Sequence, residues 1–183
     1  HRFFQRVLGL KPGQDRGNTR RLAAQLLMLF LSRRQPGTHP FVDINKNSID
    51  DFYYTHLDFD AQTPDVKRFV EIHDKLEQLL EGQKRPKLSG HDAIHLVLLL
   101  DSLWDNYTRS WESSLPDALD SFRFELVLAK KSRYERQPSE YWTQYGQWTT
   151  TRTDGADSIS RRHGFYVEKM LVLLDPLQKK DPK

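Results

Sequence analysis

Apolar residues recur every three or four positions along most of the chain, as in Leu22, Leu26, Leu29 and Phe30. This spacing is that of one face of an α-helix. No stretch of six or more residues alternates strictly between apolar and polar side chains, the pattern of a half-buried strand. The sequence therefore predicts an all-α fold, a single-domain bundle of six or seven helices over residues 1–183.

Capping residues, prolines and glycines predict where these helices begin and end. The predicted segments are Asn18 or Thr19 to about Arg34, Ser48 with its capping-box partner Asp51 through Leu57, Thr63 to Gly82, Ser89 through Trp104, Pro116 through Leu128, a short helix after Ser139, and Ser158 to Pro176. Their apolar faces predict a core made of Leu26, Leu29, Phe30, Phe69, Leu76, Val97, Leu98, Trp104, Phe122, Leu126, Phe165 and Leu171.

Composition narrows the class of protein. A chain of 183 residues can bury one sizeable core, so one domain is expected. The chain contains no cysteine, which excludes disulfides, cysteine-ligated zinc and thiol catalysis and suits a cytoplasmic protein. The longest apolar runs fall short of the roughly 20 residues that cross a bilayer, so we expect no membrane partner.

The net charge of +3 is concentrated in one part of the chain, because residues 130–169 hold eight Lys and Arg against five Asp and Glu. Aromatic residues lie between these cations. Such a segment could bind DNA, since cations neutralise phosphates and exposed aromatics stack on bases. Alternatively, the aromatics pack in the interior and the Arg stems cover apolar surface. The candidate DNA-binding residues are Lys130, Lys131, Arg133, Arg136, Arg152, Arg161 and Arg162.

The pattern His91-Asp92-Ala93-Ile94-His95 places two histidines on one helix face, where both could bind a metal, with Asp92 in the place of a zinc protease's Glu base. No third ligand is evident. The His91-Asp92 pair also resembles metal-dependent phosphohydrolases of the HD superfamily, in which His73 and either Asp117 or Asp120 would complete the site. The alternative is that these are polar residues in the first turn of a capped helix.

Three stretches together resemble a known family. They are residues 15–27 (DRGNTRRLAAQLL), 49–53 (IDDFY) and 160–170 (SRRHGFYVEKM). They are similar to the helical region of GmrSD-like proteins, which are modification-dependent or phage-defence DNA endonucleases. The motif residues in the first stretch are Asp15, Arg16, Asn18, Arg20 and Arg21.

Members of that family join a ParB-like, nucleotide-hydrolysing N-terminal domain to a C-terminal HNH nuclease. This chain carries neither the nucleotide-hydrolysis motif of the first domain nor the HNH motif of the second. The resemblance therefore implies no catalytic residue and no cofactor within it. Nucleotide and divalent metal are expected in the flanking domains, reached through a linker at about residues 175–183. The resemblance implies a helical scaffold that couples these domains and contacts the DNA backbone. An HD-type phosphohydrolase or a protein–protein interaction module are the alternatives.

Overall fold

The computed structural model describes residues 2–10, 17–35, 39–81, 88–131, 140–150, 153–174, 177 and 179–180, and the side chains of all of these except 130, 131, 140 and 141. This part of the chain forms eight α-helices and no strand, which confirms the all-α class. Seven helices match predicted segments, and the eighth, α1 (Arg2–Arg6), was not predicted. None of the helices in the described ranges combines the length and the apolar character that a membrane crossing requires.

The chain divides into two compact units. Unit 1 comprises residues 1–100 and 154–156, and unit 2 comprises residues 101–153 and 157–183. The prediction of one domain stays a prediction, and each unit is described by itself.

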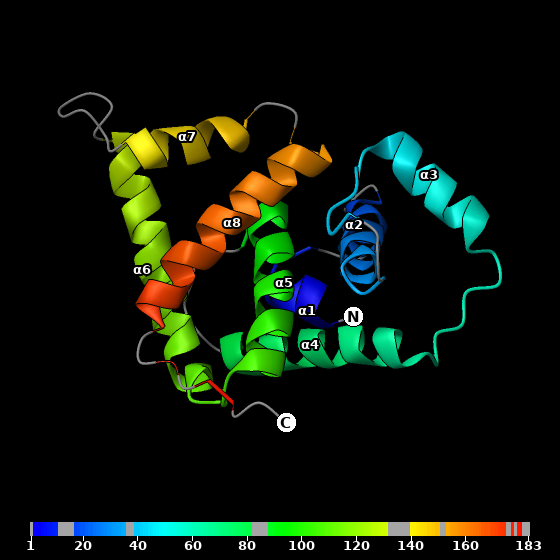
Figure 1. Ribbon diagram of the computed structural model, residues 1–183, viewed down its shortest axis with the longest axis horizontal. Helices are drawn as coiled ribbons and strands as arrows, with labels where there is room; N and C mark the ends of the chain where they lie inside the picture. The colour runs from blue at the N-terminus through cyan, green and yellow to red at the C-terminus, as the bar shows by residue number, and fades with distance from the viewer. Residues whose placement is uncertain are drawn as a thin grey trace. The chain divides into compact units, whose positions relative to one another are not determined.

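Unit 1 contains α1, α2 (Asn18–Ser32), α3 (Lys46–Thr55), α4 (Pro64–Leu80) and the first part of α5 (Gly90–Asn106) (Figure 1). Helix α4 packs against α1 and α2, and α2 also packs against α3. The predicted stripe of α2 is fully or almost fully buried, as are Leu76 of α4 and Leu98 of α5. The apolar face of α2 therefore organises this unit, as its sequence predicted.

Aromatic rings surround His73 in unit 1. Its ring centroid lies 4.9 Å from that of Phe3, 5.7 Å from that of Phe4 and 4.3 Å from that of Phe69. The Nδ1 atom donates a hydrogen bond to the carbonyl of Phe69 at 2.7 Å. Helix α1 is short, and its two phenylalanines pack against α4 through these contacts. Short helices depend on such packing.

Two helix starts in unit 1 confirm the capping predictions. Thr63 lies directly before Pro64, the first residue of α4, and its Oγ1 atom accepts a hydrogen bond from the Val66 amide at 3.4 Å. Ser89 and Asp92 form a reciprocal capping box, in which the Asp92 carboxylate accepts from the Ser89 amide and the Ser89 hydroxyl accepts from the Asp92 amide.

Two other predicted caps in unit 1 are wrong. Helix α3 begins two residues before Ser48, because the side chain of Asn45 accepts from the Ser48 amide at 3.1 Å and acts as the cap. Helix α2 is preceded by Gly17 with φ of 82°, a backbone conformation that glycine adopts without strain. Asn18 is therefore the first helical residue and makes no cap.

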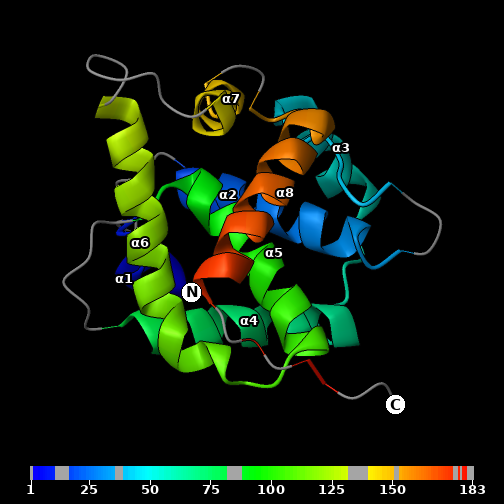
Figure 2. The same ribbon diagram turned by 60° about the vertical axis from the view of Figure 1, so that its left-hand side comes forward.

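Unit 2 contains the end of α5, α6 (Trp111–Lys131), α7 (Glu140–Trp148) and most of α8 (Ala156–Leu173) (Figure 2). Its core is an aromatic cluster drawn from α6, α7 and α8. Phe122 lies 5.4 Å from Trp142, 5.9 Å from Tyr145 and 4.8 Å from Tyr166 between ring centroids. The ring of Phe165 stacks on that of Tyr145 at 4.8 Å. This cluster holds the three helices of the unit together.

The C-terminal segment also belongs to unit 2. The Lys180 amide donates to the carbonyl of Asn106 at 2.9 Å, and Lys179 forms an isolated antiparallel bridge with Tyr107. These bonds pair the segment with the chain that follows α5.

Helices α6 and α8 begin earlier than predicted. Helix α6 begins at Trp111, so Pro116 lies inside it. Trp111 and Leu115 are fully buried, and this burial outweighs the preference of proline for a first turn. Helix α8 begins at Ala156, whose amide donates to the distant Asp43 side chain at 2.8 Å, a non-local cap that replaces Ser158.

Eight of the twelve predicted core residues are buried. The other four are only half-buried, and they are Phe69, Trp104, Leu126 and Leu171. Helical periodicity identifies the inward face of a helix but not how far its edges are covered.

Candidate functional site

The structure describes only part of the predicted DNA-binding face. Arg133, Arg136 and Arg152 lie outside the described residues, and the side chains of Lys130 and Lys131 at the end of α6 are likewise outside them. Of the seven cations, only Arg161 and Arg162 have described side chains. Arg161 is exposed on α8 and could reach a phosphate.

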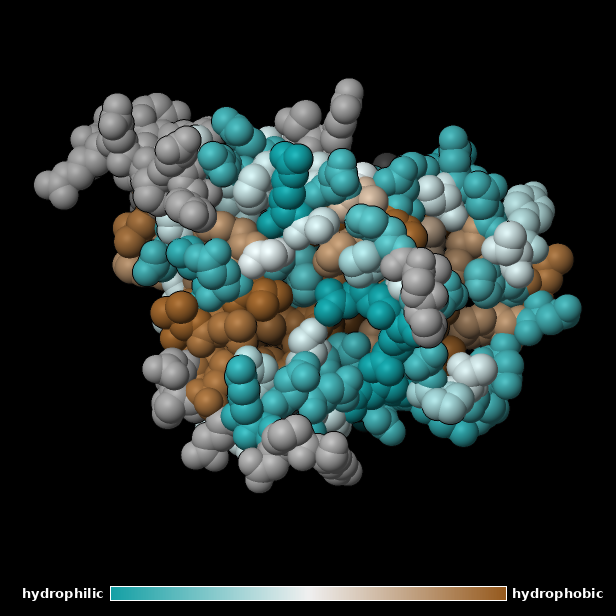
Figure 3. Space-filling model, in the orientation of Figure 1, coloured by the Kyte–Doolittle hydropathy of each residue, from teal (hydrophilic) through white to brown (hydrophobic). Residues whose placement is uncertain are grey.

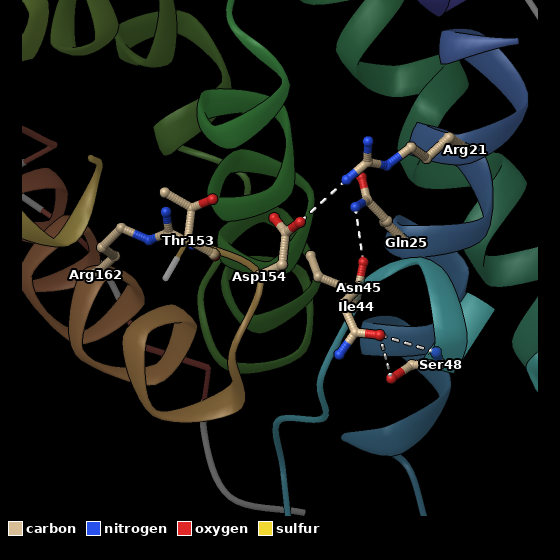
Figure 4. Close-up of polar contacts among 8 residues, drawn as sticks. All are labelled: Arg21, Gln25, Ile44, Asn45, Ser48, Thr153, Asp154 and Arg162. Carbon is tan, nitrogen blue, oxygen red and sulfur yellow. Dashed lines mark hydrogen bonds and ion pairs between the residues drawn. The ribbon is translucent and has the colours of Figure 1, made fainter. Parts of the chain in front are cut away.

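Arg162 is fully buried, which contradicts its place in that face. Its Nη1 atom donates to the carbonyl of Trp148 at 3.2 Å, and its Nη2 atom donates to the carbonyl of Thr153 (Figure 4). Hydrogen bonds to a buried charge offset part of the cost of removing it from water. In unit 2, Arg162 is therefore a clamp that holds the end of α7 and the turn after it.

The aromatics of the same segment are also internal. Tyr145 is almost fully buried and Trp142 is half-buried, and both pack in the aromatic cluster of unit 2. Their rings hold α7 against α6 and α8, so Tyr145 has no free face to stack on a base. For these two residues, the interpretation as packing residues accounts for the pattern.

The first GmrSD-like stretch is described from its third residue onward. Asp15 and Arg16 lie outside the described residues, and Asn18 and Arg20 are exposed in the first turn of α2. Arg21 forms an ion pair with Asp154, with 3.0 Å between Nη2 and Oδ2 (Figure 4). This pair joins α2 to residues 154–156 within unit 1.

Residues 154–156 are held by backbone and side-chain bonds as well. The Ile44 amide donates to the Asp154 carbonyl at 2.8 Å, and Gln25 Nε2 donates to the Ile44 carbonyl at 2.9 Å. With the bond from the Ala156 amide to Asp43, these contacts fix the three residues against the segment before α3. Residues 153–156 lie outside the predicted helices, before the one expected from Ser158, and no local signal in the sequence indicates the anchoring role of Asp154.

The second GmrSD-like stretch has a packing role. Ile49 of α3 forms a small core with Ala24 and Met28 of α2, and Phe52 packs against it. Two of the three family-like stretches thus meet where α2 packs against α3.

Three of the residues nominated for the two metal sites have described structural surroundings. Asp92 is engaged in the capping box with Ser89, and His95 is fully buried. Burial lowers the pKa of His73 to about 4, and its ring is packed among three phenylalanines. His73, His91 and Asp92 lie in unit 1, whereas Asp117 and Asp120 lie in unit 2.

Among the residues with described positions, no group of three or more His, Asp or Glu side chains is arranged to hold a metal ion. The capped-helix interpretation therefore accounts for Asp92.

Unit 1 also has an open cavity of about 490 Å³ that sequence reasoning missed. Tyr54 and Phe59 form aromatic walls, and Asp58, Asp60 and Asp65 add carboxylates. Two of these carboxylates have local roles, because Asp60 accepts from the Gln62 amide and Asp65 pairs with Arg34. Aromatic and acidic walls suit a cationic group and repel phosphate, so this cavity is not part of a DNA-backbone site.

Comparison of this chain with known protein families, with curated proteins and with solved structures finds no match. The GmrSD-like resemblance therefore stays an expectation from the three sequence stretches, and function is argued from the geometry.

Proposed function

We propose that this chain is a helical coupling region of a DNA endonuclease, joining a nucleotide-hydrolysing domain to a nuclease domain. On this proposal the chain has no catalytic residue of its own. Its function is to transmit the state of one flanking domain to the other and to contact the DNA backbone.

The observation that carries the proposal is how the chain passes between its two units. Helix α5 supplies Gly90–Leu100 to unit 1 and Asp101–Asn106 to unit 2 without a break. The second passage, between Thr153 and Asp154, is anchored on both sides, by Arg162 in unit 2 and by Arg21 in unit 1. Both arginines belong to the family-like stretches. Because Arg21 and Arg162 anchor the chain, their role favours a scaffold over an enzyme.

The experiment uses the polypeptide that contains this chain and its flanking domains. Replacing residues 1–183 with a flexible Gly/Ser linker should leave nucleotide hydrolysis intact while DNA cleavage no longer responds to nucleotide. Arg162→Lys should weaken the response in the same direction, because the ammonium cannot donate to two carbonyls in the geometry of the guanidinium. Arg161→Lys, at the neighbouring exposed position, is the matched control and should keep the parental response. Nucleotide-dependent cleavage that survives the linker replacement would refute the coupling role.

A protein-interaction role is favoured by a separate observation. Large apolar side chains are exposed on α6, where DNA would give them no partner.

A further inference from the structure

The open cavity of unit 1 lies in a strongly acidic stretch of the chain. Residues 47–66 contain five aspartates and no lysine or arginine, although the whole chain has a net charge of +3. Three of the five aspartates line the cavity, and these are Asp58, Asp60 and Asp65. Tyr54 and Phe59 line it as well. In Figure 3, mostly hydrophilic side chains cover the edge where Figure 1 places α3 and the segment after it.

The three lining carboxylates differ in what they already bind. Asp60 accepts a hydrogen bond from the Gln62 amide at 2.7 Å. Asp65 pairs with Arg34, with 3.4 Å between Oδ1 and Nη1. Asp58 is exposed and has no hydrogen-bond or ion-pair partner among the residues that the structure describes. Asp58 is therefore the lining carboxylate whose charge is available to a ligand.

Local contacts hold the segment that forms the aromatic wall. The ring of His56 packs on that of Phe52, with 4.2 Å between the centroids, and its Nδ1 atom donates to the Phe52 carbonyl at 2.9 Å. Phe52 in turn packs against the small core that joins α3 to α2. The cavity wall is thus anchored to the interior of unit 1.

Arg34 shows how unit 1 binds a guanidinium. Its Cζ atom lies 4.6 Å from the ring centroid of Phe30, and its Nη1 atom pairs with Asp65. An aromatic ring and a carboxylate of the cavity together hold this group. The cavity offers the same two kinds of group at Tyr54, which is 77% exposed, and at Asp58. A planar guanidinium suits both, because it stacks on ring faces and pairs with carboxylates.

We propose that the cavity binds an arginine side chain of a partner protein. Its guanidinium lies against the aromatic rings and pairs with the carboxylate of Asp58. Leu57 also lines the cavity and is 80% exposed, so it contacts the methylene stem of the arginine or an apolar neighbour in the partner. This interaction is independent of the coupling role proposed above.

Other occupants fit the cavity less well. A nucleic-acid backbone is repelled by the five aspartates of residues 47–66. A small free polyamine gains little, because an open cavity leaves most of its surface in water, whereas specific small-molecule sites bury most of their ligand. A lysine supplies the charge but not the flat group that stacks on a ring. An arginine within a peptide supplies the charge, the flat group and further contacts through its neighbours.

The first test is a titration of the isotopically labelled chain, followed by nuclear magnetic resonance. The probe is an acetylated, amidated tripeptide of leucine, arginine and leucine. The largest shift changes should fall on Tyr54, Asp58 and Phe59. The same peptide with citrulline in place of arginine has the same shape without the charge and should bind about tenfold more weakly. The lysine peptide should bind about threefold more weakly than the arginine peptide, and spermidine more weakly still.

The second test compares variants of the cavity with matched variants outside it. Asp58→Asn should raise the dissociation constant of the arginine peptide about fivefold. Asp51→Asn is the control, because it removes the same charge from an exposed position of α3 that does not line the cavity. It should change the constant less than about twofold. Tyr54→Leu should raise the constant about threefold, whereas Tyr53→Leu, at a position that is 52% exposed outside the cavity, should leave it unchanged.

Four results would overturn the proposal. The first is that the arginine peptide causes no shift changes at the cavity. Equal binding of the arginine and citrulline peptides would show that no cation is recognised. Equal losses for Asp58→Asn and Asp51→Asn would reduce the effect to diffuse attraction by the acidic segment. Spermidine that binds as tightly as the arginine peptide would assign the cavity to small polyamines in place of a protein partner.

Discussion

The side chain of Arg162 donates to the carbonyl of Thr153, and the next residue, Asp154, pairs with Arg21. Two arginines that lie 141 positions apart (162 − 21) in the sequence thus hold consecutive residues of one turn. Their environments differ, since Arg162 is fully buried whereas the side chain of Arg21 is 54% exposed. This difference in burial predicts that the two anchors contribute very unequally to stability.

Arg162→Ala should lower the free energy of unfolding by about 3 kcal/mol or more, because it leaves two carbonyls without their charged donor and opens a cavity in unit 2. Arg161→Ala, one position earlier and exposed, should change it by no more than about 0.5 kcal/mol. Urea titrations of the two variants and the parent measure both values. Equal losses for the two arginines would contradict the assignment of Arg162 as the clamp.

The pair between Arg21 and Asp154 should contribute far less. Ion pairs at partly exposed positions typically contribute about 0.2 to 1 kcal/mol, and salt screens them. A double-mutant cycle with Arg21→Ala and Asp154→Ala should therefore give a coupling energy in that range, decreasing between low and high salt. A coupling that is larger and independent of salt would show that the pair is more shielded from solvent than the structure indicates.

Local signals were sufficient for most of the helices. The caps at Thr63 and Ser89 each involve residues within four positions of sequence, and both helix starts were predicted. The anchor from Asp43 to the first residue of α8 is not local, and nothing near Ser158 reveals it. The start of α6 was missed because the burial of Trp111 depends on tertiary packing.

Function was less accessible from sequence than fold. The segment with the basic excess contains both exposed and buried arginines, and charge counts cannot separate Arg161 from Arg162. Only the carbonyls around Arg162, contributed by α7 and the turn after it, reveal its role. The exposed apolar side chains of α6 were also hidden, because Phe122, Phe124 and Leu126 differ little in sequence but much in exposure.

The core prediction can be tested by comparing two leucines. Leu98 is fully buried in α5, and Leu98→Ala should cost about 2 to 5 kcal/mol of stability. Leu126 was predicted as core but is half-buried, so Leu126→Ala should cost about 1 kcal/mol. Thermal or urea unfolding of the two variants measures the difference. A larger loss at position 126 than at position 98 would contradict the assignment of these side chains.

His73 should make the stability of the chain depend on pH. Burial lowers its pKa from 6.5 to about 4, and this outweighs its bond to the Phe69 carbonyl and the attraction of Asp74, which both raise it. Above pH 6.5 the ring is neutral in the folded and unfolded chain. As the pH falls from 6.5 towards 4, the unfolded chain binds a proton that the folded chain does not, so stability is lost, by about 3 kcal/mol in total.

The test is a set of urea titrations between pH 7 and pH 4 on the parent and on His73→Asn, whose amide can still donate towards the Phe69 carbonyl. The variant should lose less stability over this range than the parent, whatever its stability at pH 7. Parallel curves for the two chains would show that another group causes the acid sensitivity.

Contact with the DNA backbone is the part of the proposed function that salt titration can test. Each cation that neutralises a phosphate releases counterions, so losing one should reduce the slope of log affinity against log salt by about one unit. In the polypeptide with its flanking domains, Arg133→Ala, Arg136→Ala and Arg152→Ala combined should weaken binding to modified and unmodified duplexes alike, because phosphate contacts do not depend on base sequence.

Arg161→Ala alone should reduce the slope by about one unit, since its side chain is exposed. Arg162→Lys should leave the slope unchanged, because the buried Arg162 side chain has no access to a phosphate. Identical slopes for the triple variant, Arg161→Ala and the parent would leave this chain a coupling scaffold without DNA contact.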